Sequence, residues 1–152
     1  DLVRSRGLGD VYKRQVLTYY ESILDNLSCC HNFDVYGHLD YIARYIPANS
    51  YTYDWHDFND LICIILKTII EQGKGIEINT AGLKYGMPEP NPCLDIVKIY
   101  HDLGGEIITV GSDAHEVKFF AYRFDVVADM LKNAGFNYYT IFNERKPEFI
   151  RL

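Results

Sequence analysis

The sequence predicts an α/β fold in which about four parallel strands alternate with crossover helices. Helical and strand-like segments alternate along the chain from residue 16 onward, and glycines end several of the helical segments. The composition, 48% hydrophobic and 24% charged, is that of a globular domain with a substantial core. Such alternation implies a parallel sheet with right-handed crossovers. The sheet is either a small open one or part of a β/α barrel.

The first half of this alternation is predicted to contain two helices and two strands. Residues 16–26 form a helix, because apolar residues recur there at helical spacing: Tyr20, Ile23, Leu24 and Leu27. Residues 33–37 form a short apolar strand. The second helix begins at Asp57, as its N-cap, and ends at Gly73. Its broad apolar face consists of Leu61, Ile62, Ile65, Leu66, Ile69 and Ile70. Residues 75–79 form the next strand.

The second half continues the pattern. Pro92 suits the first turn of a third helix, which the pair Gly104 and Gly105 ends. The apolar face of that helix is made by Leu94, Val97 and Tyr100. Residues 106–110 form a third strand, and residues 136–142 a last strand followed by a tail. Between these strands lies a fourth helix, with the apolar residues Phe124, Val127, Ala128 and Leu131.

The first fifteen residues differ in character from the rest. Residues 1–15 have no sustained apolar period and hold four of the fifteen Lys and Arg residues. They resemble translated adaptor or linker sequence, and the alternative is a disordered basic arm. We therefore expect residues 1–15 to be a non-native or disordered segment, and residues 16–152 to be the domain, with native residues missing upstream.

Composition excludes some classes of protein. The formal net charge of −6 disfavours nucleic-acid binding, and no apolar run reaches the roughly 18 residues of a membrane span. The cysteines have no zinc-finger spacing: Cys29, Cys30, Cys63 and Cys93. We expect the adjacent Cys29 and Cys30 to be free thiols packed as small hydrophobes, with a disulfide or a metal pair as the alternative. Free thiols favour a cytoplasmic location.

Polar side chains gather where three of the predicted strands end. His38 follows the first strand, Glu77 and Asn79 lie on the second, and Asp113 and His115 follow the third. In parallel α/β folds these ends face one rim, where functional groups collect. Imidazole and carboxylate together suit Zn²⁺, Mn²⁺ or Fe²⁺. We therefore predict that His38, Asp113 and His115 bind metal there.

Each of these residues also has a plainer interpretation. His38 could cap a turn, and Asp113 could be the N-cap of whatever follows. Glu77 could pair with a lysine instead of lining the site beside Asn79. The remaining histidines are predicted to lie on the surface: His31, His56 and His101. A loop before residue 57 either covers a pocket or packs, through Tyr51, Tyr53 and Trp55.

Four segments resemble motifs of one known family. They are FDVYGHLDYIARY at 33–45, EINTAGLKYG at 77–86, VGSDAH at 110–115 and AGFNYYTIFNERKPEF at 134–149. The first three are similar to consecutive motifs of the polymerase and histidinol-phosphatase (PHP) family, and the last resembles the C-terminal end of its histidinol-phosphatase branch. The resemblance covers about residues 16–152.

The resemblance implies the C-terminal part of a distorted (β/α)7 TIM-like barrel with up to three Mn, Zn or Fe ions. A metal-bridging hydroxide would hydrolyse L-histidinol phosphate to L-histidinol and phosphate, a step of histidine biosynthesis. His38, Asp113 and His115 match the family's metal ligands, and the last two are the predicted catalytic residues.

The same resemblance assigns substrate-binding residues. Arg44 matches an arginine that clamps the substrate phosphate, a task suited to a guanidinium fork. Its alternative is a surface residue on a helix. Lys84 follows the NTAG turn, where relatives carry a basic residue near the substrate. Glu77 and Asn79 are predicted to line the same site.

The chain departs from the family at its start. An HxH motif, a further histidine and a bridging glutamate should precede residue 16, and none is present. We therefore expect the isolated chain to be nearly inactive and poorly stable, although its full-length parent is an enzyme. The alternatives are a PHP-family phosphoesterase that acts on nucleotides or other phosphomonoesters, and a non-catalytic metal-binding α/β module.

Overall fold

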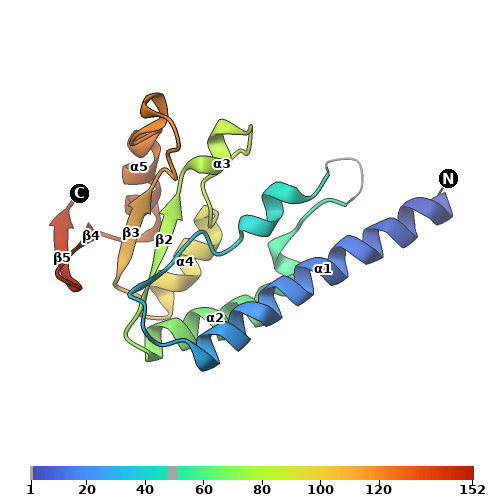
Figure 1. Ribbon diagram of the computed structural model, residues 1–152, viewed down its shortest axis with the longest axis horizontal. Coiled ribbons are helices and arrows are strands. Elements are labelled where there is room, and N and C mark those ends of the chain that lie inside the picture. Colours follow the sequence, from blue (N-terminus) through green and yellow to red (C-terminus); the bar gives the residue numbers. More distant parts are fainter. Residues whose placement is uncertain (1, 48–50) are drawn as a thin grey trace.

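The parallel sheet predicted from the alternation is present in the computed structural model, which describes residues 2–47 and 51–152 (Figure 1). Its strand order is β1-β2-β3, and both pairings are parallel. The strands are β1 (Val35–Tyr36), β2 (Gly75–Asn79) and β3 (Ile108–Gly111). The helices are α1 (Leu2–Cys29), α2 (Asn59–Glu71), α3 (Ala81–Lys84), α4 (Leu94–Asp102) and α5 (Phe124–Ala134). Short 3₁₀ helices are η1 (Tyr41–Tyr45), η2 (Trp55–Phe58) and η3 (Val117–Phe119).

The core lies between the sheet and the helices. The long helix α1 runs alongside α2 under the sheet (Figure 1). The predicted stripe of α2 is buried at Ile62, Ile65, Leu66 and Ile69. The central strand β2 contributes Ile76 and Ile78, both fully buried. A β-carbon at Gly75 would lie 2.5 Å from the carbonyl oxygen of Ile107, so only glycine lets β2 begin this close to the chain that leads into β3.

The predictions of a fourth parallel strand and of a C-terminal tail are wrong. Strand β4 (Tyr138–Asn143) lies beside β3 but pairs antiparallel with β5 (Lys146–Arg151), which occupies the predicted tail. The turn between them has positive φ at both central residues, Glu144 and Arg145, as a tight two-residue hairpin requires. Since glycine or asparagine usually marks such a turn, the Glu-Arg pair gave no signal of it.

Helix α1 begins earlier than predicted. It starts at Leu2 rather than at residue 16, and so includes most of the segment expected to be non-native or disordered. Lys13 of this part lies 2.8 Å from an Asp57 carboxylate oxygen. The foreign origin of residues 1–15 stays a prediction.

The start of α2 also differs from the prediction. Asp57 is not its N-cap, because the 3₁₀ helix η2 comes first and α2 begins only at Asn59. Asp54 takes the capping role one turn earlier, accepting a hydrogen bond from the His56 amide. Asp57 faces α1 and instead pairs with Lys13 and accepts from the Tyr51 hydroxyl.

The expected packing of the adjacent thiols is wrong. Cys29 and Cys30 are both exposed, with their sulfur atoms 3.7 Å apart. The buried face of α1 consists of Val16, Tyr20, Ile23 and Leu27. The helix ends at Cys29, before that face could continue for another turn, and both thiols therefore stay in solvent.

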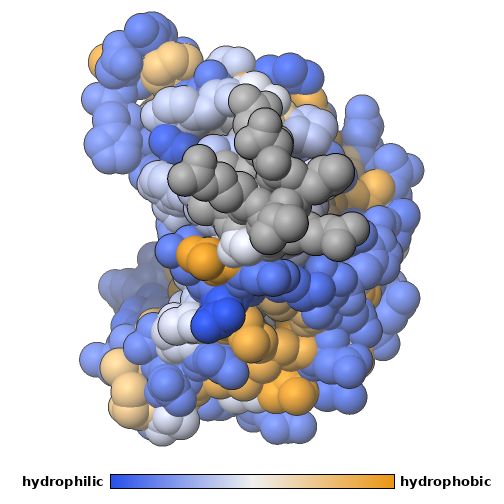
Figure 2. Space-filling model, turned by 90° about the vertical axis from the view of Figure 1, so that its right-hand side faces the viewer, coloured by the Kyte–Doolittle hydropathy of each residue, from blue (hydrophilic) through white to orange (hydrophobic). Residues whose placement is uncertain are grey.

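The surface view in Figure 2 is mainly hydrophilic, with a smaller group of hydrophobic side chains among the polar ones. Some large apolar side chains of the described chain are strongly exposed, such as Val117 at 94% and Phe120 at 82%. Within the described ranges, no helix combines the length and the apolar character that spanning a membrane requires.

Candidate active site

The carboxyl ends of the three parallel strands bring the predicted polar segments to one edge of the sheet. The register aligns Glu77 with Thr109 and Asn79 with Gly111, so β2 and β3 end side by side. His38 follows β1 and Asp113 follows β3 within two residues of each strand end. The strand order therefore places His38 and Asp113 on opposite sides of Glu77.

Two glycines leave room for the Glu77 side chain. A β-carbon at Gly111 would overlap Glu77 Oε1, and one at Gly37 would lie 3.3 Å from Oε2. The carboxylate thus lies between the ends of the two outer strands. Asn79 fixes it by donating from Nδ2 to Glu77 Oε2 at 3.1 Å, while Asn79 Oδ1 accepts from the Ala81 amide. The partner of Glu77 is therefore Asn79, not a lysine.

His38 carries a buried ring nitrogen with no partner. Its Nδ1 has no hydrogen bond within the described part of the chain, and its ring centre lies 4.3 Å from that of Tyr41, with the two rings tilted by 30°. The backbone of His38 has a φ of 33°, and that of Asp113 a φ of 45°. Positive φ is uncommon outside glycine and concentrates at functional sites. Both positions are therefore held in conformations that the surrounding structure must enforce.

The predicted metal ligands do not form a complete metal centre. Across residues 2–47 and 51–152, no three His, Cys, Asp or Glu side chains come together so as to hold one ion. Asp113 and His115 are neighbours, with Oδ1 and Nδ1 3.9 Å apart, but the His115 side chain is 84% exposed. The unpartnered nitrogen of His38 fits a ligand role. The described donor set is otherwise too small for the multinuclear centre that the family resemblance implies.

Both predicted basic residues reach this edge. Lys84, at the end of α3, donates to the carbonyl oxygens of Ser112 and Asp113 at 3.3 and 3.2 Å, and so ties α3 to the loop after β3. Arg44 lies in η1, half-buried, with its guanidinium 3.6 Å from the centre of the Tyr85 ring. Stacking on an aromatic face holds a guanidinium in place while its edge stays available to an anion.

Tyr41 lies in the segment after β1, close to the loop after β3. Its hydroxyl accepts hydrogen bonds from Arg44 Nη1 at 3.0 Å and from the Tyr45 hydroxyl at 2.9 Å. The bond with Tyr45 raises the pKa of Tyr41, and the nearby carboxylate of Asp113 raises it further. The loop after β3 therefore lies near Tyr41, which also binds Arg44.

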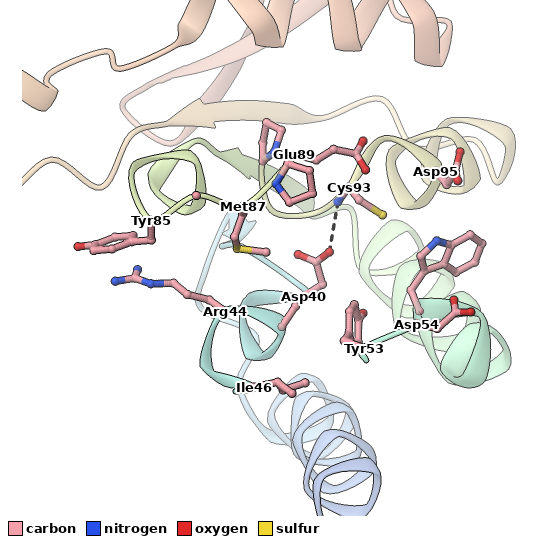
Figure 3. Close-up of a pocket in the computed structure, with 15 residues that line it drawn as sticks. Asp40, Arg44, Ile46, Tyr53, Asp54, Tyr85, Met87, Glu89, Cys93 and Asp95 are labelled. Atoms are coloured by element: carbon pink, nitrogen blue, oxygen red, sulfur yellow. Dashed lines mark hydrogen bonds between the residues drawn. The ribbon is translucent and has the colours of Figure 1, made fainter. Parts of the chain in front are cut away.

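A cavity of about 510 Å³ opens beside Arg44 (Figure 3). Asp40, which was not among the predicted site residues, lies on its lining and is buried. Its carboxylate accepts from Asn91 Nδ2 at 2.7 Å and from the Cys93 amide at 3.2 Å. Burial raises the pKa of Asp40 to about 6. The carboxylate joins η1, which carries Arg44, to the start of α4.

Replacing Asp40 with alanine is expected to lower the free energy of unfolding by about 2–4 kcal/mol. The substitution leaves two buried donors, Asn91 Nδ2 and the Cys93 amide, without their acceptor. Urea denaturation of both proteins at neutral pH measures the change. Asp129→Asn, at an exposed position of α5, is the control and should change stability little. A loss under 0.5 kcal/mol for Asp40→Ala would contradict this account of the carboxylate.

The chain is similar to proteins of one enzyme family. The PHP domain family matches residues 5–81, about half of the chain. A probable histidinol-phosphatase of Thermotoga maritima is 43% identical over 110 residues, which cover 72% of this chain and 44% of the relative. One from Clostridium acetobutylicum is 32% identical over 117 residues, covering 77% and 46%. This chain therefore spans about half the length of the curated relatives it matches.

A solved structure shares the fold. The crystal structure of histidinol phosphate phosphatase from Lactococcus lactis, complexed with zinc, L-histidinol and phosphate, aligns with a TM-score of 0.65 at 23% sequence identity. The alignment covers 86% of this chain and 49% of that chain.

Proposed function

This chain belongs to the PHP domain family, and from that membership we propose that its full-length parent is a metal-dependent phosphatase. The proposed reaction hydrolyses L-histidinol phosphate to L-histidinol and phosphate. The observation that carries the proposal is the edge of the sheet, where Lys84 donates to the Asp113 carbonyl oxygen and Arg44 donates to Tyr41 in the segment after β1. Cationic side chains beside metal-ligand types suit the binding of a phosphate monoester.

We further propose that the three parallel strands are the C-terminal part of a distorted (β/α)7 barrel. The chain spans about half of its relatives, and β1 pairs with β2 alone among the described strands. An outer strand with one free edge is what a sheet cut from a closed barrel would leave. The same open edge supports the prediction that the isolated chain is poorly stable.

In the full-length parent, the residues of this chain would bind the phosphate, line the site and contribute metal ligands. Arg44 and Lys84 would hold the phosphate, and Glu77 and Asn79 would line the site. His38, Asp113 and His115 would contribute metal ligands. Bound Mn, Zn or Fe ions would supply a water-derived nucleophile and neutralise charge on phosphate oxygens. Because the described ligands do not complete such a centre, no step of the reaction is assigned to a metal on this chain alone.

A second candidate function is a non-catalytic metal-binding α/β module. A module of this kind would need no missing half of a barrel. A cooperative unfolding transition of the isolated chain, with no gain of activity on extension, would support this function over the first. A cytoplasmic location stays a prediction for either.

The proposed function is tested by extending the chain. Residues 16–152 are fused to the N-terminal half of the Thermotoga maritima relative, and the fusion is called the joined protein below. We expect only the joined protein to bind two or more metal ions per chain and to release phosphate from L-histidinol phosphate. Asp113→Ala should abolish its activity. Metal analysis and a phosphate-release assay measure both properties.

Two results would contradict the proposal. One is a joined protein that binds metal but does not hydrolyse L-histidinol phosphate. The other is metal-dependent hydrolysis by the 152-residue chain itself, abolished by Asp113→Ala, because it would mean that the ligands already present suffice.

A further inference from the structure

We infer that the cavity beside Arg44 takes the cationic, organic end of a phosphomonoester, while Arg44 holds the phosphate end. This inference rests on the proposed function and deepens it, because it names the residues that would select the substrate. The candidate specificity-determining residues are Glu89 and Asp95. Aromatic side chains form walls of the cavity: Tyr53, Trp55 and Tyr85.

The charges on the cavity lining are separated in space. In Figure 3, Arg44 and Tyr85 lie at one end of the cavity, and Asp54 and Asp95 lie at the other. Arg44 is the one cation of the described lining, whereas four carboxylates line it: Asp40, Asp54, Glu89 and Asp95. A volume of about 510 Å³ is in the range of small-molecule sites. A ligand that is anionic at one end and cationic at the other matches this distribution.

The carboxylates at the acidic end keep oxygen atoms available to a ligand. Glu89 Oε1 accepts from the Leu94 amide at 3.1 Å, which fixes the side chain at the start of α4. Asp95 Oδ1 lies 3.5 Å from Lys98 Nζ. Among the described residues, the second oxygen of each has no hydrogen-bond partner. Glu89 is therefore positioned by the helix and still able to accept from an ammonium or imidazolium group.

The aromatic walls add to the attraction for a cation. The ring faces of tryptophan and tyrosine attract ammonium and imidazolium groups. Tyr53 is fixed by a 2.6 Å hydrogen bond between its hydroxyl and that of Tyr20 in the core. Trp55 begins η2 and is half-buried. The loop before residue 57, which was predicted either to cover a pocket or to pack, thus packs on the core through Tyr53 and lines the cavity through Trp55.

The same charges disfavour the other class of substrate. A nucleoside monophosphate would place its uncharged ribose and base near Asp54, Glu89 and Asp95, where they gain no ionic attraction. L-histidinol phosphate carries an amine and an imidazole in place of those groups. The cavity therefore favours amino phosphomonoesters over nucleotides.

Trp55 allows a direct test, because it is the single tryptophan of the chain and lines the cavity. L-histidinol, which has no phosphate, is titrated into the 152-residue chain while tryptophan fluorescence is recorded. We expect saturable binding that Glu89→Gln weakens about tenfold. The amide oxygen of glutamine can still accept from the Leu94 amide, so the start of α4 is preserved. Glu71→Gln, at an exposed carboxylate at the end of α2, is the matched control.

Calorimetry on the joined protein repeats the measurement in case the short chain or its variant does not fold. There, Glu89→Gln should raise KM for L-histidinol phosphate about tenfold and change kcat less than about twofold. Equal affinity of Glu89→Gln and the parent protein for L-histidinol in both assays would overturn the inference. So would tighter binding of a nucleoside monophosphate than of L-histidinol phosphate.

The inference and the proposed function fail in different ways. Glu89-dependent binding of L-histidinol without hydrolysis by the joined protein supports the cavity assignment and refutes the proposed reaction. If the joined protein hydrolyses L-histidinol phosphate and Glu89→Gln does not change KM, the proposed reaction is supported and the cavity assignment is refuted.

Discussion

Replacing Arg44 with alanine in the joined protein is expected to lower kcat/KM for L-histidinol phosphate by about 10²–10³-fold. Arg44 is the one cation on the described lining of the cavity, and its guanidinium is fixed by the Tyr85 ring and by the Tyr41 hydroxyl. A positioned fork of this kind binds two phosphate oxygens at once, and an alanine offers neither charge nor donor. Steady-state phosphate release measures the loss.

Two further variants make this result specific to Arg44. Arg44→Lys should recover only part of the activity, because an ammonium group keeps the charge but loses the fork and the stacking on Tyr85. Arg151→Ala, at an exposed position of β5, should leave kcat/KM within about twofold. Activity of Arg44→Ala near that of the unmodified joined protein would place the phosphate elsewhere.

Replacing Tyr100 with alanine is expected to lower the free energy of unfolding by about 3–5 kcal/mol. Tyr100 is fully buried on α4, its ring lies against Gly105, and its hydroxyl donates to the Ile107 carbonyl at 2.9 Å. Truncation leaves a large cavity between α4 and the chain that enters β3. Because domains are stable by only about 5–15 kcal/mol, much of the fold's stability would be lost. Urea denaturation followed by circular dichroism measures it.

Milder substitutions separate ring packing from the hydrogen bond. Tyr100→Phe should cost only about 1 kcal/mol, since the Ile107 carbonyl still accepts from the Ile76 amide. Tyr45→Ala, at a side chain 60% exposed, should change stability by less than 1 kcal/mol. A loss for Tyr100→Ala no larger than that for Tyr45→Ala would mean that the ring does not support the core.

The local pattern of the sequence was sufficient to predict most of the main helices and strands. The strand at Gly75–Asn79 was predicted with its observed bounds, and the apolar stripe of α2 was identified from its spacing. Placing Glu77 and Asn79 on the same face needed only the two-residue period of a strand, and their side chains do meet. The gathering of strand-end residues on one edge followed from parallel pairing.

Contacts between segments far apart in the chain determined the features that local sequence patterns did not predict. The hairpin of β4 and β5 turns through Glu144 and Arg145, whose positive φ no local signal marked. Arg145 also pairs with Asp34, which is distant in the chain. Asp40 looked like one polar residue of a short motif, and only the packing of η1 against α4 made it a buried acceptor. The cavity joins Trp55, Tyr85 and Glu89, which have no common sequence motif.

The sequence by itself thus determined the α/β class, the alternation of helices with three parallel strands, and the residue types at the ends of those strands. These depend on periodicity and on pairing rules that act over a few residues. The tertiary structure alone decided that Glu77 lies between two glycines and that Arg44 stacks on Tyr85. It also decided that, within residues 2–47 and 51–152, the metal-ligand side chains do not converge into one complete centre. Such outcomes depend on distances between segments far apart in the chain, and those distances are set by the packing of the whole core.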